Sequence, residues 1–255
     1  MCTLIIALRP GHDWPVVLGA NRDERIERES RPPARHWPDR SQVVAGLDTV
    51  GGGSWLGVSD WGLVAAVMNR SGTLGPQDGK RSRGELVLEA LEHPDARSAA
   101  LALVDLNPAA YRPFNLFVAD AASAHWLRLV EGGSKVEAMA LTRGVHMLTA
   151  RDLNDTHDAR IRVHLRRLRS AALPDPDRDD WSDWQRLLAS RLHAESDGPG
   201  AAMCVGPHDG FGTVSSALVA LPRHTVGDIR PRMLYAPVAP ESGDWRAIDL
   251  TAARV

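Results

Sequence analysis

The sequence predicts an α+β fold with mostly antiparallel sheets. Short apolar runs separated by turn residues occur in blocks, and these blocks alternate with blocks of helical periodicity. Parallel βαβ units would require a helix after each strand, which the pattern lacks. Because 44% of the 255 residues are hydrophobic, the chain can bury a full core, and we interpret residues 1–255 as one domain.

Two hairpins are expected in the first third of the chain. The runs 3–8 and 14–20 flank the turn Arg9-Pro10-Gly11-His12-Asp13, and the runs 54–59 and 63–69 flank Asp60-Trp61-Gly62. Four strands should therefore precede the first helix.

Two helices should then cover one face of a sheet. Ser82 can cap a helix over 85–91, and Asp95 can start a second helix that ends at Asn107-Pro108. The remaining elements are expected as strands at 114–118, 124–130 and 136–141, helices at about 157–169 and 182–193, and closing strands at 213–221, 233–236 and 245–250.

Composition excludes several classes of function. A formal net charge of -2 gives no reason to expect a nucleic-acid partner. Two cysteines are too few for a disulfide framework, and no secretory signal pattern marks the N-terminus, so a cytoplasmic location is expected. The apolar stretches fall short of the ~20 residues that a membrane span needs. Neither Cys-x-x-Cys nor His-Glu-x-x-His occurs, so we expect no metal and no cofactor. The oligomeric state stays open.

Cys2 directly follows the initiator Met1. Removal of Met1 would leave a thiol and a free α-amine on one residue, which together form a nucleophile and its base. The α-amine titrates near pH ~7.7 to 8.0 and a free thiol near ~8.5, so the amine can take the thiol proton at physiological pH. The alternative is an incidental cysteine at a frayed chain end.

The first hairpin brings charged residues to Cys2. A turn centred near His12 or Asp13 places Cys2 opposite residues 22–24, about one strand separation of ~5 Å away. There the Arg22 guanidinium would favour the thiolate, and the Asp23 carboxylate would orient the α-amine. The alternative is that these residues merely begin the solvated charge run that continues to Arg31.

The second hairpin predicts an oxyanion donor. The same register argument places Asn69 opposite Gly51-Gly52-Gly53, where missing side chains would leave an open spot. An Asn amide in such a place is a common oxyanion-hole donor. The alternative is that the glycines only turn the chain.

The predicted helix at 157–169 is rich in arginine. Its apolar residues fall on one side, so we interpret the arginines as a solvated face rather than as a binding surface. They are Arg160, Arg162, Arg166, Arg167 and Arg169.

Several short motifs appear together in a defined order. They are Met1-Cys2-Thr3-Leu4-Ile5, Asn21-Arg22-Asp23-Glu24, Pro33-Ala34, Trp37, Gly52-Gly53-Ser54-Trp55-Leu56-Gly57, Asn69-Arg70, Ser82-Arg83-Gly84 and Phe114-Asn115-Leu116. This set resembles the NRDE-motif family, the transport and Golgi organisation protein 2-like proteins. The resemblance is dense over about the first 120 residues and looser afterwards.

That resemblance implies an αββα sandwich like that of the N-terminal nucleophile hydrolases. Among these hydrolases, the motif set is similar above all to the choloylglycine hydrolase and penicillin V acylase group, which cleaves amide bonds with an N-terminal cysteine. It implies catalytic roles for Cys2, Arg22, Asp23 and Asn69. The motif residues expected in a binding role are Asn21, Gly53, Trp55 and Asn115.

Two positions depart from the family pattern. Ala150 stands where the family has an Asn, and Val214 stands where it has an Arg. A second oxyanion donor and a supporting cation are thus missing from their usual places, and Asn154 or Arg151 are the candidates to replace them.

The leading hypothesis is an N-terminal cysteine amidohydrolase acting on a small-molecule C–N amide bond. The second is a non-catalytic binding or trafficking protein for haem or an acyl-CoA-type lipid, as the resemblance also suggests. An interaction scaffold is the third possibility, and no residue pattern favours it.

Overall fold

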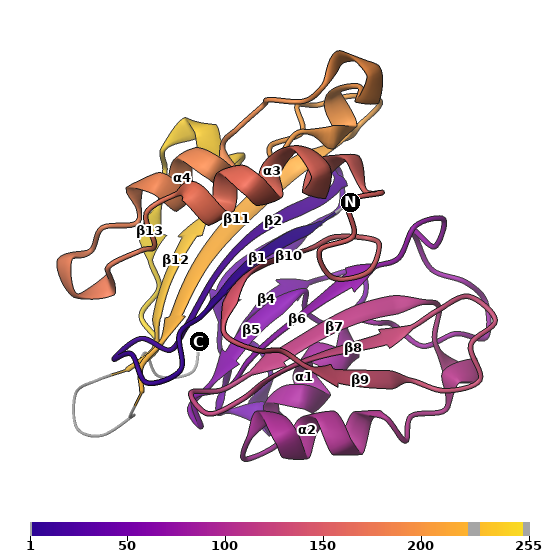
Figure 1. Cartoon of the computed structure of the whole chain (residues 1–255). Helices are drawn as coiled ribbons and strands as arrows, with labels where there is room; N and C mark the ends of the chain where they lie inside the picture. The colour runs from indigo at the N-terminus through magenta and orange to yellow at the C-terminus, as the bar shows by residue number, and fades with distance from the viewer. Residues whose placement is uncertain (1, 224–229, 252–255) are drawn as a thin grey trace.

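Two antiparallel sheets pack face to face, and each carries helices on its outer surface (Figure 1). The computed structural model describes residues 2–223 and 230–251. Among these, the six-stranded sheet has the order β10-β1-β2-β11-β12-β13, and the seven-stranded sheet runs from β3 to β9 in sequence order. The strands are β1 (Thr3–Leu8), β2 (Val16–Arg25), β3 (Ser30–Ala34), β4 (Val43–Asp48), β5 (Leu56–Ser59), β6 (Val64–Asn69), β7 (Phe114–Ala119), β8 (Ala124–Leu129), β9 (Glu137–Ala140), β10 (Gly144–Leu148), β11 (Phe211–Leu221), β12 (Arg232–Ala236) and β13 (Arg246–Ala247).

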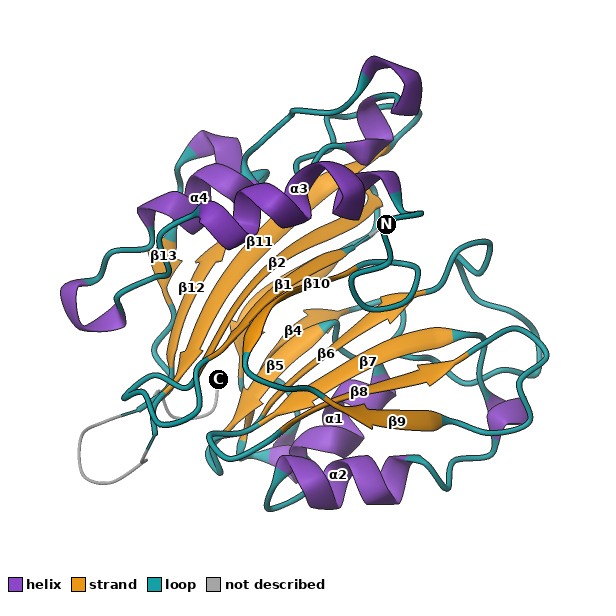
Figure 2. Cartoon of the chain, in the orientation of Figure 1, coloured by secondary structure: helices purple, strands orange, loops and turns teal. Residues whose placement is uncertain are grey.

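The helices form the two outer layers (Figure 2). Helices α1 (Glu85–Leu91) and α2 (Ala96–Leu103) cover the seven-stranded sheet, whereas α3 (Ala159–Ser170) and α4 (Ser182–Leu188) cover the six-stranded sheet. Short 3₁₀ turns lie at Pro38–Arg40, Pro108–Ala110, Pro176–Arg178, Glu195–Asp197, Pro199–Ala201 and Pro240–Ser242. The predicted αββα sandwich is confirmed.

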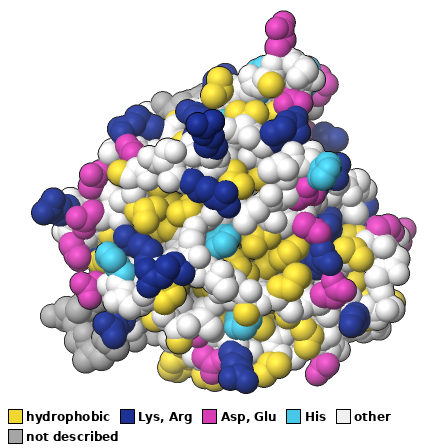
Figure 3. Space-filling model, viewed as in Figure 1, with side chains coloured by type: hydrophobic (Ala, Val, Ile, Leu, Met, Phe, Trp, Pro, Cys, Tyr) yellow, Lys and Arg dark blue, Asp and Glu magenta, His cyan; other side chains and the backbone are white. Residues whose placement is uncertain are grey.

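Strand periodicity divides the apolar side chains among three cores. In β1, Leu4, Ile6 and Leu8 enter the core between the sheets, while Ile5 and Ala7 enter the core under α3 and α4. Both faces of β1 are therefore buried, which explains why its sequence is apolar throughout instead of alternating. In the view of Figure 3, hydrophobic side chains gather in the middle of the face.

The structure adds three strands to those expected. Six strands, not four, precede α1, because β3 and β4 lie between the two predicted hairpins. Two prolines hide β3, which is tolerated because β3 is an edge strand. The third addition, β10, is a short strand that pairs with β1 at the other sheet's edge.

Some predicted boundaries also change. Helix α1 begins at Glu85 after Gly84 without a side-chain cap, so Ser82 is not its N-cap as predicted. Asp95 does cap α2, accepting from Ser98 N at 2.7 Å. Helix α4 ends at Leu188, short of the predicted residue 193, and β13 is reduced to two residues.

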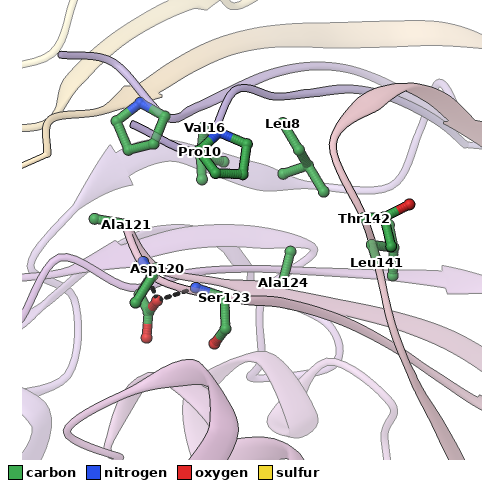
Figure 4. A pocket seen from close by; sticks show the side chains of 11 residues that line it. Leu8, Pro10, Val16, Asp120, Ala121, Ser123, Ala124, Leu141 and Thr142 are labelled. Carbon is green, nitrogen blue, oxygen red and sulfur yellow. Dashed lines mark hydrogen bonds between the residues drawn. The ribbon is translucent and has the colours of Figure 1, made fainter. Parts of the chain in front are cut away.

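A small pocket lies at the tip of the first hairpin (Figure 4). Leu8 and Val16 from the hairpin meet Ala124, Leu141 and Thr142 around a volume of about 40 Å³. This is room for little more than water. The pocket is at the opposite end of β1 from Cys2, so it is separate from the predicted site.

The sheets are tied together at the end where β1 begins. Asn115 of β7 is fully buried, and its amide nitrogen donates to Thr149 O at 2.9 Å and to Arg151 O at 2.7 Å. Arg70 adds an ion pair with Asp152 at 2.8 Å. The chain that leaves β10 of one sheet is therefore bound to β7 of the other.

None of the helices in the described ranges has both the length and the apolar character needed to cross a bilayer.

Candidate functional site

Cys2 lies just before β1, at the edge of the core between the sheets. In the first hairpin, the residue pair farthest from the turn is Thr3 with Asn21. Continuing this register by one residue places Cys2 opposite Arg22, within the predicted residues 22–24. The Cys2 Sγ is 3.7 Å from the backbone oxygen of Asp23. The residue is half-buried and packs against the core between the sheets.

The environment of the thiol favours its neutral form. Burial raises the pKa of the Cys2 thiol most strongly, and the negative charge of Asp23 adds to this, while the positive charge of the amino terminus and, more weakly, the Arg22 guanidinium lower it. Burial outweighs the favourable charge, so a nucleophilic thiolate at this position needs a base.

Arg22 points into the space between the sheets and is held on several sides. Its guanidinium lies 4.2 Å from the centre of the Trp55 ring and donates to Ser30 Oγ at 2.8 Å. Asp48 lies 3.9 Å away, and only 4% of the Arg22 side chain is exposed. The Trp55 ring in turn fills the place of a side chain at Gly46, where an added Cβ would come within 2.4 Å of it.

Asp23 points the opposite way, toward the helices. One carboxylate oxygen accepts from Arg160 Nη1 at 2.8 Å and the other from Thr213 Oγ1 at 2.7 Å. The same Arg160 nitrogen donates to Thr3 Oγ1 at 2.5 Å, and Arg160 Nη2 donates to Gly200 O at 2.9 Å. The buried ion pair between Arg160 and Asp23, extended by the bond to Thr3, therefore joins β1 and β2 next to Cys2.

The position of Arg160 corrects the prediction of a wholly solvated arginine face. Arg160 is 3% exposed, because it lies on the same side of α3 as Ile161 and His164. The other four arginines of this helix are exposed, as predicted. The helical spacing contained the signal, since residues three and four apart from Arg160 fall on the apolar side.

Asn21 makes its hydrogen bonds within the protein. Its amide nitrogen donates to Leu188 O at 2.9 Å and Met203 O at 2.8 Å, and its oxygen accepts from Ser216 Oγ at 2.6 Å. Asn21 thus connects β2 to β11 and to the segments beside α4. Asn115 is used in the same way, because its oxygen also accepts from Arg70 at 2.7 Å and from Trp126 at 3.2 Å.

The Gly51-Gly52-Gly53 segment lies beyond the paired parts of β5 and β6, and of its three glycines only Gly52 has nothing within 4 Å of an added Cβ. Pairing between β5 and β6 ends at Leu56 with Ala66, while Asn69 pairs with Phe114 of β7. Gly53 packs instead on Gly84, where an added Cβ would lie 2.4 Å from the carbonyl carbon. Within the described chain, no hydrogen bond is recorded for the half-buried Asn69 side chain.

The two departures from the family pattern have clear structural positions. Ala150 is buried, and its backbone oxygen accepts from Ser71 N at 3.0 Å. Val214 occupies the irregularity where β11 shifts register against β2. Of the candidate replacements, Asn154 uses its side-chain oxygen on Met147 N at 2.9 Å, and Arg151 is exposed.

Replacing Arg160 tests the buried ion pair. The variant Arg160→Ala should lower the free energy of unfolding by about 3 to 5 kcal/mol, because it removes the cation that Arg160 places beside the buried Asp23 carboxylate. Denaturant titration measures this, and Arg166→Ala on the exposed side of α3 should change stability by less than about 0.5 kcal/mol. Equal effects of the two substitutions would contradict the assignment.

Replacing Gly53 tests the backbone contact with Gly84. We expect Gly53→Ala to destabilise the protein by about 3 kcal/mol, because the new Cβ overlaps backbone that cannot swing aside. Gly200→Ala is the matched control, since nothing lies within 4 Å of a Cβ there. Thermal melting of both variants compares them, and a Gly53→Ala protein as stable as the control would refute the contact.

Comparison with solved structures finds proteins of the same fold. The N-acylethanolamine-hydrolyzing acid amidase ortholog of Caenorhabditis elegans superposes with a TM-score of 0.55 at 14% identity, covering 88% of this chain and 94% of that one. A mutant conjugated bile acid hydrolase from Clostridium perfringens gives 0.55 at 11% identity, covering 100% and 95%. Identities this low show a shared fold only.

Comparison of sequences identifies the family. The Transport and Golgi organization protein 2 homolog of Homo sapiens is 32% identical over 160 residues, which are 58% of this chain and 56% of that protein. The Bos taurus homolog is 34% identical over 129 residues, 47% and 45% of the two chains. The chain thus spans about half the length of these curated relatives. The family model described as Transport and Golgi organisation 2 matches residues 1–224, and the chain belongs to this family.

Proposed function

We propose that this protein is an N-terminal cysteine amidohydrolase in which Cys2, freed of Met1, attacks the carbonyl carbon of a small-molecule amide. The observation that carries the proposal is the position of the Cys2 thiol beside Arg22 and Asp23, at the edge of the core between the sheets. The neighbouring folds support it, because two of them belong to proteins described as an amidase and a hydrolase.

The chemistry begins with activation of the thiol. Because burial raises the pKa of the Cys2 thiol, it is neutral near pH 7 until a base removes its proton. The α-amine exposed by loss of Met1 is a base on the same residue, so proton transfer needs no other side chain. Arg22 stabilises the resulting thiolate by its charge.

Attack of the thiolate on the carbonyl forms a tetrahedral oxyanion. The Asn69 amide, which has no recorded partner within the described chain, and backbone N–H groups are the proposed donors to it. Collapse of this intermediate breaks the C–N bond, and the amine leaves with the proton held by the α-ammonium. Water then hydrolyses the thioester and restores the thiol.

Arg160 acts as a positioning residue. Through its bonds to Asp23 and Thr3, it holds the strands on either side of Cys2 in register. It also places a buried cation close to the site from α3, although Val214 replaces the arginine of the family pattern on β11.

A second candidate function is non-catalytic binding of haem or an acyl-CoA-type lipid. It is favoured by Ala150, which offers no side-chain donor, and by the neutral state of the thiol. The two functions differ in whether Cys2 is required for turnover.

The substitution Cys2→Ala separates them. We expect it to reduce amide hydrolysis by about 10³-fold or more, because the covalent step is lost. Mass-spectrometric detection of released amine from a broad panel of N-acyl amides measures activity, and Cys204→Ala serves as the control because Cys204 is the other free thiol. Protein that has lost Met1 yet hydrolyses nothing, and binds haem or acyl-CoA equally well with Ala at position 2, would support the binding function instead.

The pH dependence of alkylation tests how the thiol is activated. In chains that keep Met1, labelling of Cys2 by iodoacetamide should rise with a midpoint above the ~8.5 of an ordinary cysteine, because burial raises the thiol pKa. In chains that have lost Met1, the midpoint should fall, because an ammonium on the same residue favours the thiolate. Intact mass identifies the two forms, and identical midpoints would argue against the α-amine as base.

A further inference from the structure

Two guanidinium groups converge on one loop at the end of the molecule where Cys2 lies. Arg83, just before α1, donates from Nη1 to Thr73 O at 2.9 Å and to Pro113 O at 3.0 Å. Arg112, just before β7, donates from Nη1 to Leu74 O at 2.6 Å and to Gly75 O at 3.0 Å. Arg83 Nη2 also reaches Gly75 O, at 3.3 Å, so both side chains meet at a single carbonyl.

Neither cation is balanced by a carboxylate within the described residues. Other half-buried arginines of this protein are paired at short range, as Arg28 is with Asp48 at 2.9 Å and Arg70 with Asp152 at 2.8 Å. Arg83 and Arg112 have only carbonyl and hydroxyl oxygens, which carry partial charges. Burial and the repulsion of Arg112 lower the pKa of Arg83 to about 10, so the local positive charge is poorly compensated.

Each guanidinium retains unused donors in the described structure. In each side chain, Nη1 makes most of the hydrogen bonds and Nη2 makes one. Neither Nε makes a hydrogen bond within the described residues. Nε and Nη2 form the edge that binds a carboxylate or phosphate with two parallel hydrogen bonds. An oxyanion between the two groups would satisfy these donors and balance the charge.

The pair lies at the same end of the molecule as the proposed nucleophile. The loop that it holds follows Asn69 directly, and Arg83 precedes Gly84, which packs against Gly53, two residues before the Trp55 ring that lies over Arg22. Both side chains are half-buried, so they are open to solvent at this end. A group bound there would be part of a molecule whose carbonyl reaches Cys2.

We propose that Arg83 and Arg112 form an oxyanion-binding subsite next to Cys2, and that the substrate amide carries a carboxylate or a phosphate that binds there. That the bound molecule is a substrate rests on the proposed function, whereas binding of an oxyanion at the subsite does not depend on turnover.

Two alkylating reagents of matched chemistry test the subsite. Iodoacetate carries a carboxylate and iodoacetamide does not, but with both reagents the Cys2 sulfur forms a C–S bond while iodide leaves with the electron pair. The ratio of the two labelling rates at Cys2, measured by mass spectrometry of the N-terminal peptide, therefore cancels the thiolate fraction. Purified full-length protein is used, with N-acetylcysteine as the reference thiol.

We expect the ratio of iodoacetate to iodoacetamide rates to exceed that of N-acetylcysteine by about fivefold or more, as one nearby unit charge would produce. Arg112→Gln and Arg83→Gln should each reduce the ratio by about threefold, whereas Arg112→Lys keeps the charge and should retain most of it. Arg97→Gln, on the exposed side of α2, should leave it unchanged.

A ratio equal to that of N-acetylcysteine, or one that both Gln variants leave unchanged, would overturn the subsite. A loss of the ratio in Arg112→Lys as large as in Arg112→Gln would overturn it as well, because the effect would then come from loop displacement. Inorganic phosphate should slow labelling of the wild type and not of Arg112→Gln, which tests phosphate separately from carboxylate. The labelling rates do not require amide hydrolysis. Failure of the proposed function would instead appear as absence of amine release from the panel of N-acyl amides.

Discussion

The position of β2 in the middle of a sheet that is covered on both faces determines how the site is built. Its neighbours β1 and β11 pair with it along both edges, and its side chains alternate between the space under the helices and the space between the sheets. In Asn21-Arg22-Asp23, the middle residue therefore faces the space between the sheets, where it lies over the Trp55 ring. The two outer residues face the helices, where they are buried among polar partners.

Burial of polar groups explains how the supports around the thiol are arranged. An isolated carboxylate under the helices would cost several kcal/mol. Arg160 and Thr213 offset this cost by donating to Asp23, and Thr3 in turn accepts from Arg160. Asn21 and Asn115 solve the same problem with amides that bind main-chain atoms of distant segments. These groups fix the backbone around the proposed site.

Local patterns predicted much of this arrangement. The first hairpin places Cys2 against Arg22 because a constant register follows from its turn, and apolar spacing located α1, α2 and α3 within a few residues. The role of Gly53 was not predictable in this way. Its neighbour Gly84 is distant in the sequence, and only the packed structure shows that two backbones meet there. Arg160 was missed because a basic helix is most often solvated on its charged side, whereas one arginine of this helix lies on the apolar side. The strand β3 was hidden by its prolines, and β10 by the Gly144 and His146 that interrupt its apolar pattern.

The bonds that Asn115 makes to Thr149 and Arg151 have a mechanical consequence for the sandwich. Together with the Arg70–Asp152 ion pair, they hold the two sheets together at the end where Cys2 lies. The opposite end, around Leu8 and Ala124, is lined mainly by apolar contacts and contains the small pocket. Because the polar bonds between the sheets are concentrated at the end that holds Cys2, thermal separation of the sheets would begin at the tip of the first hairpin. The surroundings of the thiol would separate last.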